Sequence, residues 1–203
     1  MSHKLPEGCP RHTPWGATQH GEAISKQIHT VSTSSHGGIH VAEVENMLIP
    51  EPFRRDDGWY EEDCDWAVVA HVFPHLFREQ DVIAAKRTLR SWRWRSWEEC
   101  YEEEVPIGES PQKAEHLFRL EHASDLLTVA AFGDWHRSVP PGMVGVVASP
   151  GGCRTPGRVE RCFLVTAEAY GKRHENPSGS LVVDPGATAP WVGPHEVIGE
   201  EAP

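Results

Sequence analysis

The fold is indicated first by the stretch IHTVSTSSHGGIHV, residues 28–41. Its first half is mostly β-branched and roughly alternating, and Gly37-Gly38 precede the second apolar run, Ile39-His40-Val41. Two such runs around a glycine turn are typical of a β-hairpin. We therefore predict a hairpin within residues 24–41. Residues 1–22 are polar and rich in His, Gly and Pro, so we expect them to form a loose N-terminal arm.

Helical patterns follow the hairpin. A short helix is expected at residues 42–48, where Pro50 and Pro52 prevent its continuation. Two longer segments, about 61–73 and 81–94, repeat apolar residues every three to four positions, the spacing of one buried helix face. These residues are Trp66, Val69, Phe73 and Leu76 in the first segment and Val82, Ala85, Leu89 and Trp92 in the second. The sequence thus predicts a helical part over about residues 42–105.

From residue 115 the pattern changes to short β-rich runs bounded by Gly, Pro, Asp or Asn, at 117–120, 126–132, 143–148, 162–165 and 181–183. Such spacing predicts a mostly antiparallel sheet or partial barrel over about residues 115–185. The expected fold class is α+β, with an N-terminal β-hairpin and two helices packed with this C-terminal sheet. We predict a single domain over residues 23–185 and a flexible acidic tail over 186–203.

Composition narrows the function classes. The chain has 203 residues, 30 acidic against 19 basic, and a net charge of −11. This charge disfavours general nucleic-acid binding and favours solubility or a basic partner, and the simpler interpretation is a solvated acidic surface. Its five cysteines form no CxxC pair, so we expect neither a disulfide framework nor a structural zinc. No apolar run is long enough to span a membrane, and residues 1–7 lack the apolar core of a signal peptide. We therefore expect a cytoplasmic protein with no cofactor and no membrane contact.

His36 and His40 flank the diglycine, and a carboxylate-rich stretch follows about twenty residues later. On an extended strand the two histidines would lie about 13 Å apart, too far for one metal, at roughly 3.3 Å per residue. A tight turn at the glycines would bring them together, with Glu61, Glu62 or Asp63 as a third ligand. The alternative, which we favour, is a hairpin turn whose histidines bond nearby backbone. In either case we predict that the two segments lie close in space.

Cys64 is the single thiol of the second segment, which reads Trp59-Tyr60-Glu61-Glu62-Asp63-Cys64-Asp65-Trp66. A thiol near a helix N-terminus has a lowered pKa, and His36 or His40 would serve as its base. The spacing resembles that of circularly permuted papain-like thiol hydrolases, which implies His36, His40, Asp63 and Cys64 as catalytic residues. The surrounding carboxylates oppose this, because their charge raises the thiol pKa. The alternative is a small buried cysteine packed under Trp66.

Cations and indoles alternate in the segment Arg87–Trp97, RTLRSWRWRSW. Residues 78–95 carry six basic and two acidic side chains, a local charge of +4. Arginine binds phosphate groups and tryptophan stacks on bases, so the segment is compatible with nucleic-acid binding. The same two residue types also form the hot spots of protein interfaces. An acidic block, residues 98–104, follows at once. We favour a helix whose tryptophans face the core and whose arginines pair with that block, ahead of a protein interface and of nucleic-acid binding.

Further polar and aromatic residues lie in Phe132-Gly133-Asp134-Trp135-His136. The surrounding pattern predicts a strand, a polar loop and a second strand. Asp134 and His136 at a strand end could complete a site with the histidine hairpin. We include Trp135 and His136 among the candidate binding residues, together with Trp59, Tyr60, Glu61, Glu62 and Asp65. The alternative is an ordinary loop.

Several of these stretches resemble a domain of unknown function found in proteins of bacterial plasmids and phages. The stretches are Thr13-Pro14-Trp15-Gly16, Ser35 to His40, Gly58 to Ala67, Phe132 to His136 and Phe163 to Tyr170, and the resemblance covers about residues 13–185. It implies a mobile-element setting and assigns no role to any residue.

From that setting we expect an accessory protein that binds a protein partner, such as a host defence nuclease or regulator. A thiol- or metal-dependent hydrolase that uses His36, His40 and Cys64 is the alternative. A nucleic-acid-binding module that uses Arg87–Trp97 is a third hypothesis. The sequence names neither the partner nor the oligomeric state.

Overall fold

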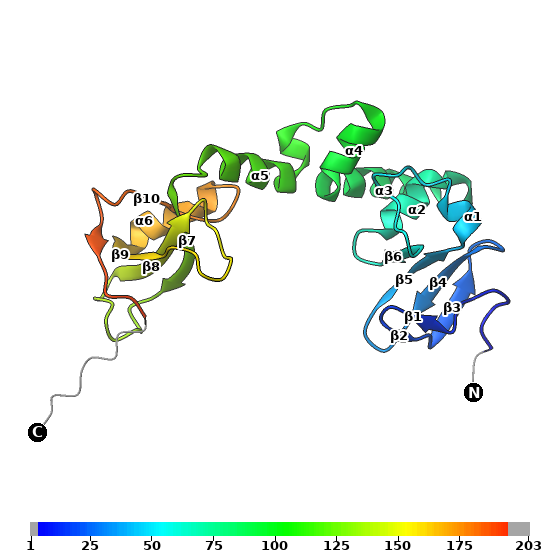
Figure 1. Cartoon of the computed structure of the whole chain (residues 1–203), viewed down its shortest axis with the longest axis horizontal. Helices are drawn as coiled ribbons and strands as arrows, with labels where there is room; N and C mark the ends of the chain where they lie inside the picture. The colour runs from blue at the N-terminus through cyan, green and yellow to red at the C-terminus, as the bar shows by residue number, and fades with distance from the viewer. Residues whose placement is uncertain (1–3, 195–203) are drawn as a thin grey trace, which may run out of the picture. The chain divides into compact units, whose positions relative to one another are not determined.

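The computed structural model describes residues 4–194. They form two compact units, with the boundary between Gln112 and Lys113. Unit 1 contains β1 to β6 and α1 to α4, and unit 2 contains β7 to β11 and α6, with α5 beginning at the boundary (Figure 1). The fold class is α+β, as predicted. The single domain expected over residues 23–185 is instead divided, because two separate sheets each bury their own apolar residues.

Unit 1 is built on a four-stranded antiparallel sheet in the order β3-β4-β5-β6. Its strands are β3 (His20–Ala23), β4 (Ile28–Ser32), β5 (Gly37–Val41) and β6 (Trp59–Glu61). The predicted hairpin is confirmed as β4 and β5, in which Ile28 pairs with Val41 and Ser32 with Gly37. Strand β6 adds residues 59–61 to the edge of this sheet, so Glu61, where the sequence had indicated the start of a helix, belongs to a strand. Backbone pairing with β5 explains the difference.

The helices of unit 1 are α1 (Glu43–Asn46), α2 (Trp66–Val72), α3 (Glu79–Trp92) and α4 (Trp94–Tyr101), with short 3₁₀ turns at Pro74–Leu76 and Ile107–Glu109. Helices α2 and α3 pack together, and α2 also contacts β5 and β6 (Figure 1). Their apolar faces and one face of the sheet share a core that includes Ile28, Tyr60, Val69 and Leu89. Val69 and Phe73 are buried as expected, whereas Trp66 is only partly buried.

The N-terminal segment covers the other face of this sheet. Its strands β1 (His12–Thr13) and β2 (Gly16–Ala17) pair with each other. His29, on the covered face, is 2% exposed, and its Nε2 lies 3.2 Å from the carbonyl oxygen of Glu7. A Cβ atom on Gly38 would lie 2.6 Å from Cη2 of Trp15, so the glycine makes room for this tryptophan. Residues 4–22 are therefore part of the fold and not the loose arm expected from their composition.

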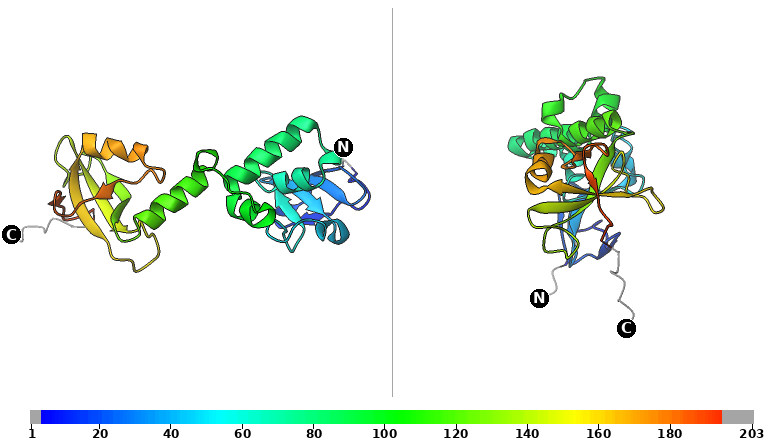
Figure 2. Two further views of the ribbon diagram at one scale, coloured as in Figure 1. Left: turned by 90° about the horizontal axis from the view of Figure 1, so that it is seen from above. Right: turned by 90° about the vertical axis from the view of Figure 1, so that its left-hand side faces the viewer.

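Unit 2 is a curled five-stranded antiparallel sheet in the order β10-β7-β8-β9-β11. The strands are β7 (Leu126–Phe132), β8 (Met143–Pro150), β9 (Arg161–Thr166), β10 (Val182–Val183) and β11 (Ala189–Pro190). Helix α6 (Ala167–Gly171) follows β9 directly and lies beside the sheet, with a 3₁₀ turn at Lys172–Glu175 after it (Figure 2). The predicted antiparallel sheet is confirmed, with strands at four of the five expected places.

Two predictions for unit 2 differ from the structure. Residues 117–120 belong to helix α5 (Pro111–Glu121), which has proline at its first position and an ion pair between Glu115 and Arg119 four residues apart. These helical features outweigh the local β-propensity. The segment 186–194 is not a flexible tail, because β11 pairs with β9 and Trp191 is 7% exposed against Gly145. The rest of the predicted tail, 195–203, lies outside the described residues.

Within residues 4–194, no helix combines the length and the apolar character needed to cross a membrane.

Candidate functional site

The two reactive segments of unit 1 come together at one edge of the sheet, as the sequence predicts. Strands β5 and β6 pair so that Gly38 lies opposite Glu61 and His40 opposite Trp59. The imidazole of His40 packs on the indole of Trp59, with ring centroids 4.6 Å apart. His36, at the turn, places Nδ1 3.6 Å from Oε1 of Glu61. Sheet register, and not a bend at the diglycine, causes this proximity.

Trp15 from the covering segment completes the aromatic part of the site. Its ring centroid lies 5.7 Å from that of Trp59, and the two planes meet at 77°. Both indoles are partly exposed. Asp57 follows in the loop before β6 and accepts a hydrogen bond from the backbone N–H of Trp59 at 3.1 Å. We call this surface, formed by Trp15, His40, Asp57, Trp59 and Glu61, the aromatic–acidic edge.

Tyr60 points to the opposite face of the sheet and is a core residue. It is fully buried, its hydroxyl donates to Oδ1 of Asn46 at 2.6 Å, and it accepts from the backbone N–H of Arg55 at 3.1 Å. Burial raises the pKa of this phenol. The alternation of side chains along β6 therefore separates Tyr60 from Trp59 and Glu61, and it excludes Tyr60 from the candidate binding surface.

Asp65 holds an internal ion-pair network. The residue is 8% exposed, and its Oδ2 accepts from Nε of Arg55 at 2.9 Å while its Oδ1 accepts from Nη1 of Arg93 at 2.6 Å. Arg93 belongs to the predicted Arg/Trp segment, so one of its cations is used inside unit 1. Both oxygens of Asp65 have arginine partners, which gives this carboxylate a structural role.

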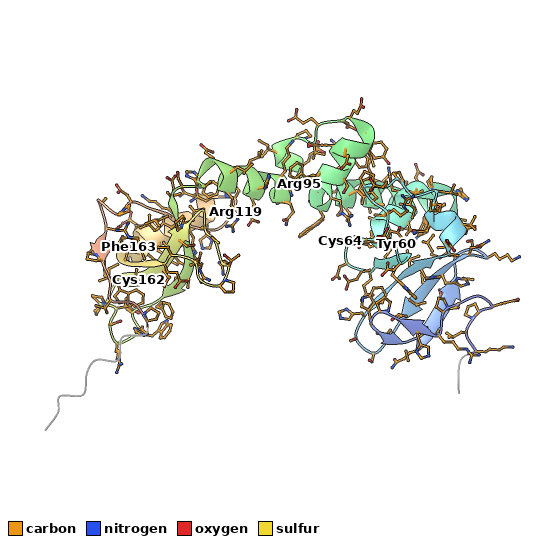
Figure 3. The ribbon with its side chains drawn as sticks, viewed as in Figure 1. Tyr60, Cys64, Arg95, Arg119, Cys162 and Phe163 are labelled. Carbon is orange, nitrogen blue, oxygen red and sulfur yellow. The ribbon has the colours of Figure 1, made fainter. Side chains whose placement is uncertain are left out.

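Cys64 lies in the segment between β6, which ends at Glu61, and α2, which begins at Trp66; Figure 3 labels it together with Tyr60 of β6. Burial is the main cause that raises the pKa of its thiol, and the charges of Asp65 and Asp63 raise it further, while Arg93 acts in the opposite direction. The reactive form of a cysteine nucleophile is the thiolate. The geometry around Cys64 therefore favours the neutral thiol, and the acidic neighbours act as the sequence analysis anticipated.

The Arg/Trp segment spans the end of α3 and the first half of α4. Trp97 is 3% exposed, and the cations of Lys86 and Arg90 lie over its ring at 5.5 and 5.4 Å. Arg90 also pairs with Glu103 at 2.6 Å and with Glu109 at 2.8 Å. Trp92 differs from Trp97, because it is 55% exposed. The internal pairing of arginines with the acidic block that follows them is confirmed for Glu103.

Asp134, Trp135 and His136 belong to unit 2 and contact side chains of that unit. Nδ1 of His136 lies 2.9 Å from Oγ of Ser138, and that oxygen also accepts from the indole N–H of Trp191 at 3.0 Å. Asp134 accepts from the backbone N–H of Gly142 at 3.3 Å. Trp135 is 75% exposed. These contacts form a local cluster around the β7–β8 loop.

The two remaining candidate residues, Glu62 and Asp63, are exposed to solvent. Across the described residues, no group of three or more His, Cys, Asp or Glu side chains is arranged to hold a metal ion.

The sequence analysis missed Trp15, Arg55 and Asp57 as parts of this site. The Thr13-Pro14-Trp15-Gly16 turn carried a signal, because a large indole in a short hairpin requires a surface to pack against. Nothing local indicated that this partner is Gly38, 23 positions later.

A comparison with protein-family models matches residues 8–123 to a domain of unknown function, DUF7007. The chain belongs to the DUF7007 family. The DUF7007 match covers more than half of the chain and includes every residue of the aromatic–acidic edge, together with α5. The segments around 132–136 and 163–170, which the resemblance had included, lie beyond the match. Searches of curated proteins and of solved structures each found no match.

The pKa of His40 predicts how the stability of the DUF7007 domain depends on pH. Burial, followed by the charge of His29, lowers this pKa, and Asp57 only partly opposes them. Below about pH 6.5 His40 binds a proton in the unfolded chain, whereas in the folded state it stays neutral until the pH is lower. We therefore expect the free energy of unfolding to decrease as the pH falls from about 6.5 toward the depressed pKa of His40. Above about pH 6.5, His40 should cause no loss of stability.

Chemical denaturation of wild type and His40→Gln between pH 5 and 8, roughly the window in which imidazole titrates, measures this effect. The variant should show a shallower pH dependence. Some dependence should persist, because burial also lowers the pKa of His71. His36→Gln serves as the control, since His36 is exposed. Identical pH profiles for wild type and His40→Gln would contradict the prediction.

Proposed function

We propose that this chain acts by binding a protein partner through the aromatic–acidic edge. The observation that carries the proposal is the pair of partly exposed tryptophans, Trp15 and Trp59, held together at a sheet edge beside carboxylates. Tryptophan is among the residues that contribute most to protein–protein binding energy. A partly exposed indole pair that packing already orients loses little conformational entropy on binding.

The setting of this activity follows from the resemblance to plasmid- and phage-encoded proteins. In that setting we propose a cytoplasmic accessory protein of a mobile element, whose partner is a host defence nuclease or regulator. The net charge of −11 favours a partner with a basic surface. The same charge supports rapid association with such a partner at low salt.

Two observations weigh against the alternatives. The raised pKa of Cys64 opposes a thiol nucleophile, which needs the thiolate at neutral pH. Arg90 and Arg93 are already paired with carboxylates, so their charge is less available to phosphate groups. Protein binding therefore has more support from the geometry than a hydrolase or a nucleic-acid-binding module.

A pull-down with the tagged full chain from host lysate tests the proposal. We expect wild type to retain a partner in stoichiometric amount, and Trp59→Ala to lose most of it, because truncation of a central aromatic residue costs about 2 kcal/mol or more. Trp92→Ala is the matched control, since Trp92 is also exposed but lies on α3. Circular dichroism establishes that both variants are folded.

Equal capture by wild type and Trp59→Ala would show that another surface binds the partner. Failure of wild type to retain any protein from a lysate of the natural host would contradict the proposal as a whole.

A further inference from the structure

A small, open hollow lies at the aromatic–acidic edge. It has a volume of about 190 Å³ and is lined by Pro14, Trp15, Arg55, Asp57, Trp59, Glu61 and Asp65. This volume equals that of about six water molecules at roughly 30 Å³ each. The hollow therefore has room for the charged end of one long side chain.

Two of its walls are indoles held in place by packing. The rings of Trp15 and Trp59 stand nearly perpendicular, at 77°, so they present differently oriented surfaces to the same space. Trp15 rests on Gly38, where any Cβ would approach its ring to 2.6 Å, and Trp59 rests against His40. A cation close to an indole face is attracted by the ring quadrupole. The walls are thus formed before any ligand arrives.

The charge of the hollow is negative. Arg55 contributes one cation, but its Nε and Nη2 both contact Oδ2 of Asp65, and Arg93 occupies the other oxygen. The other two carboxylates of the hollow are those of Asp57 and Glu61. Among the described residues, neither of them pairs with an arginine or a lysine, and the ion contact of Glu61 is with His36. Residues 54–65 contain six carboxylates against two arginines.

We propose that this hollow binds an arginine side chain of the protein partner. Its guanidinium would stack on an indole and donate hydrogen bonds to Glu61 and Asp57. Arginine fits better than lysine, because its planar guanidinium stacks on aromatic rings and forms bidentate hydrogen bonds with carboxylates. The compact ammonium of lysine does neither. The inference rests on the proposed function and names the group that the aromatic–acidic edge recognises.

The test uses a minimal probe, the acetylated and amidated peptide Gly-Gly-Arg-Gly-Gly, titrated into the ¹⁵N-labelled full chain at low salt. We expect the indole N–H signals of Trp15 and Trp59 to shift in a saturable way, and the signal of Trp92 to stay unchanged. Trp15→Phe and Trp59→Phe assign the two signals. The neutral isostere with citrulline in place of arginine should bind roughly tenfold more weakly, the range expected for losing a charged hydrogen bond.

Substitutions of the carboxylates provide a second readout. Glu61→Gln and Asp57→Asn should each weaken the arginine peptide about two- to fivefold, as expected for exposed ion pairs. Asp57→Asn keeps an acceptor for the backbone N–H of Trp59. Glu22→Gln is the matched control, because Glu22 is 77% exposed on β3, at the opposite edge of the same sheet. It should bind the peptide as wild type does.

Absence of shifts at Trp15 and Trp59 would overturn the inference, and so would equal binding of the citrulline peptide or of a third peptide with lysine in place of arginine. The result is separable from the pull-down, because the peptide needs no natural partner. A partner lost in Trp59→Ala, with no binding of the peptide, would leave the proposed function intact and remove only the arginine site. If the wild type binds the peptide but Trp59→Ala still captures the partner, the hollow binds arginine and the partner binds elsewhere. That result would remove the proposed function.

Discussion

Replacement of Trp97 with Ala is expected to lower the free energy of unfolding of unit 1 by about 3–5 kcal/mol, the range for removing a large aromatic side chain from a core. Trp97 is 3% exposed and packs in the core that joins the sheet to α2 and α3. Its indole N–H also donates to Glu103 at 3.3 Å, and Lys86 and Arg90 lie over its ring. The substitution therefore removes packing, a hydrogen bond and two cation–π contacts together.

Urea denaturation followed by amide signals of β4 and β5 reports on unit 1 separately from unit 2. Trp92→Ala is the control within the same segment. Because Trp92 is 55% exposed, we expect a change of at most about 1 kcal/mol. Similar losses in the two variants would mean that Trp97 does not carry the core contact, and that the Arg/Trp segment should be reconsidered as a binding surface.

Replacement of Asp65 with Asn is expected to cost about 2–3 kcal/mol, less than the full effect of breaking a buried ion pair because Arg55 is partly exposed. The side chains of Arg55 and Arg93 are 47% and 23% exposed, against 11% for Asp65. An amide cannot balance the two guanidinium charges. The exposed neighbour Asp63 is the control, and Asp63→Asn should change stability by less than about 0.5 kcal/mol.

A double-mutant cycle with Arg93→Gln isolates the interaction. If Asp65 stabilises unit 1 through Arg93, the two substitutions should cost less together than the sum of their separate effects, by about 0.5 kcal/mol or more. Additive costs would show that the pair contributes no coupling, and that Asp65 acts through Arg55 alone or through packing.

The local pattern of apolar residues was sufficient to predict most of the helices and strands. The alternation in residues 28–33 and 39–41 predicts β4 and β5, and the helical spacing of Val82, Ala85 and Leu89 predicts α3. These segments were predictable because the period of the backbone sets which side chains share a face. Residues 117–120 were predicted wrongly, since a short apolar run is compatible with a strand or a helix and its neighbours decide between them.

The candidate site was predicted in part. Two clusters separated by a short loop indicated that His40 and Trp59 lie near each other, and the structure places them directly opposite on β5 and β6. The same clusters could not separate Tyr60, which is buried, from Trp59, which is partly exposed. That separation requires knowing that residues 59–61 form a strand and which of its faces meets the core.

The sequence by itself determined the fold class, the acidic charge, the main helices and strands, and the neighbourhood of the histidine and carboxylate clusters. Only the tertiary structure decided that the chain forms two units, that residues 4–22 cover a sheet, and that Trp15 meets Trp59 over Gly38. It also assigned Asp65 to two arginines. The physical reason is that burial and ion pairing depend on contacts between residues distant in the chain, which local periodicity does not encode.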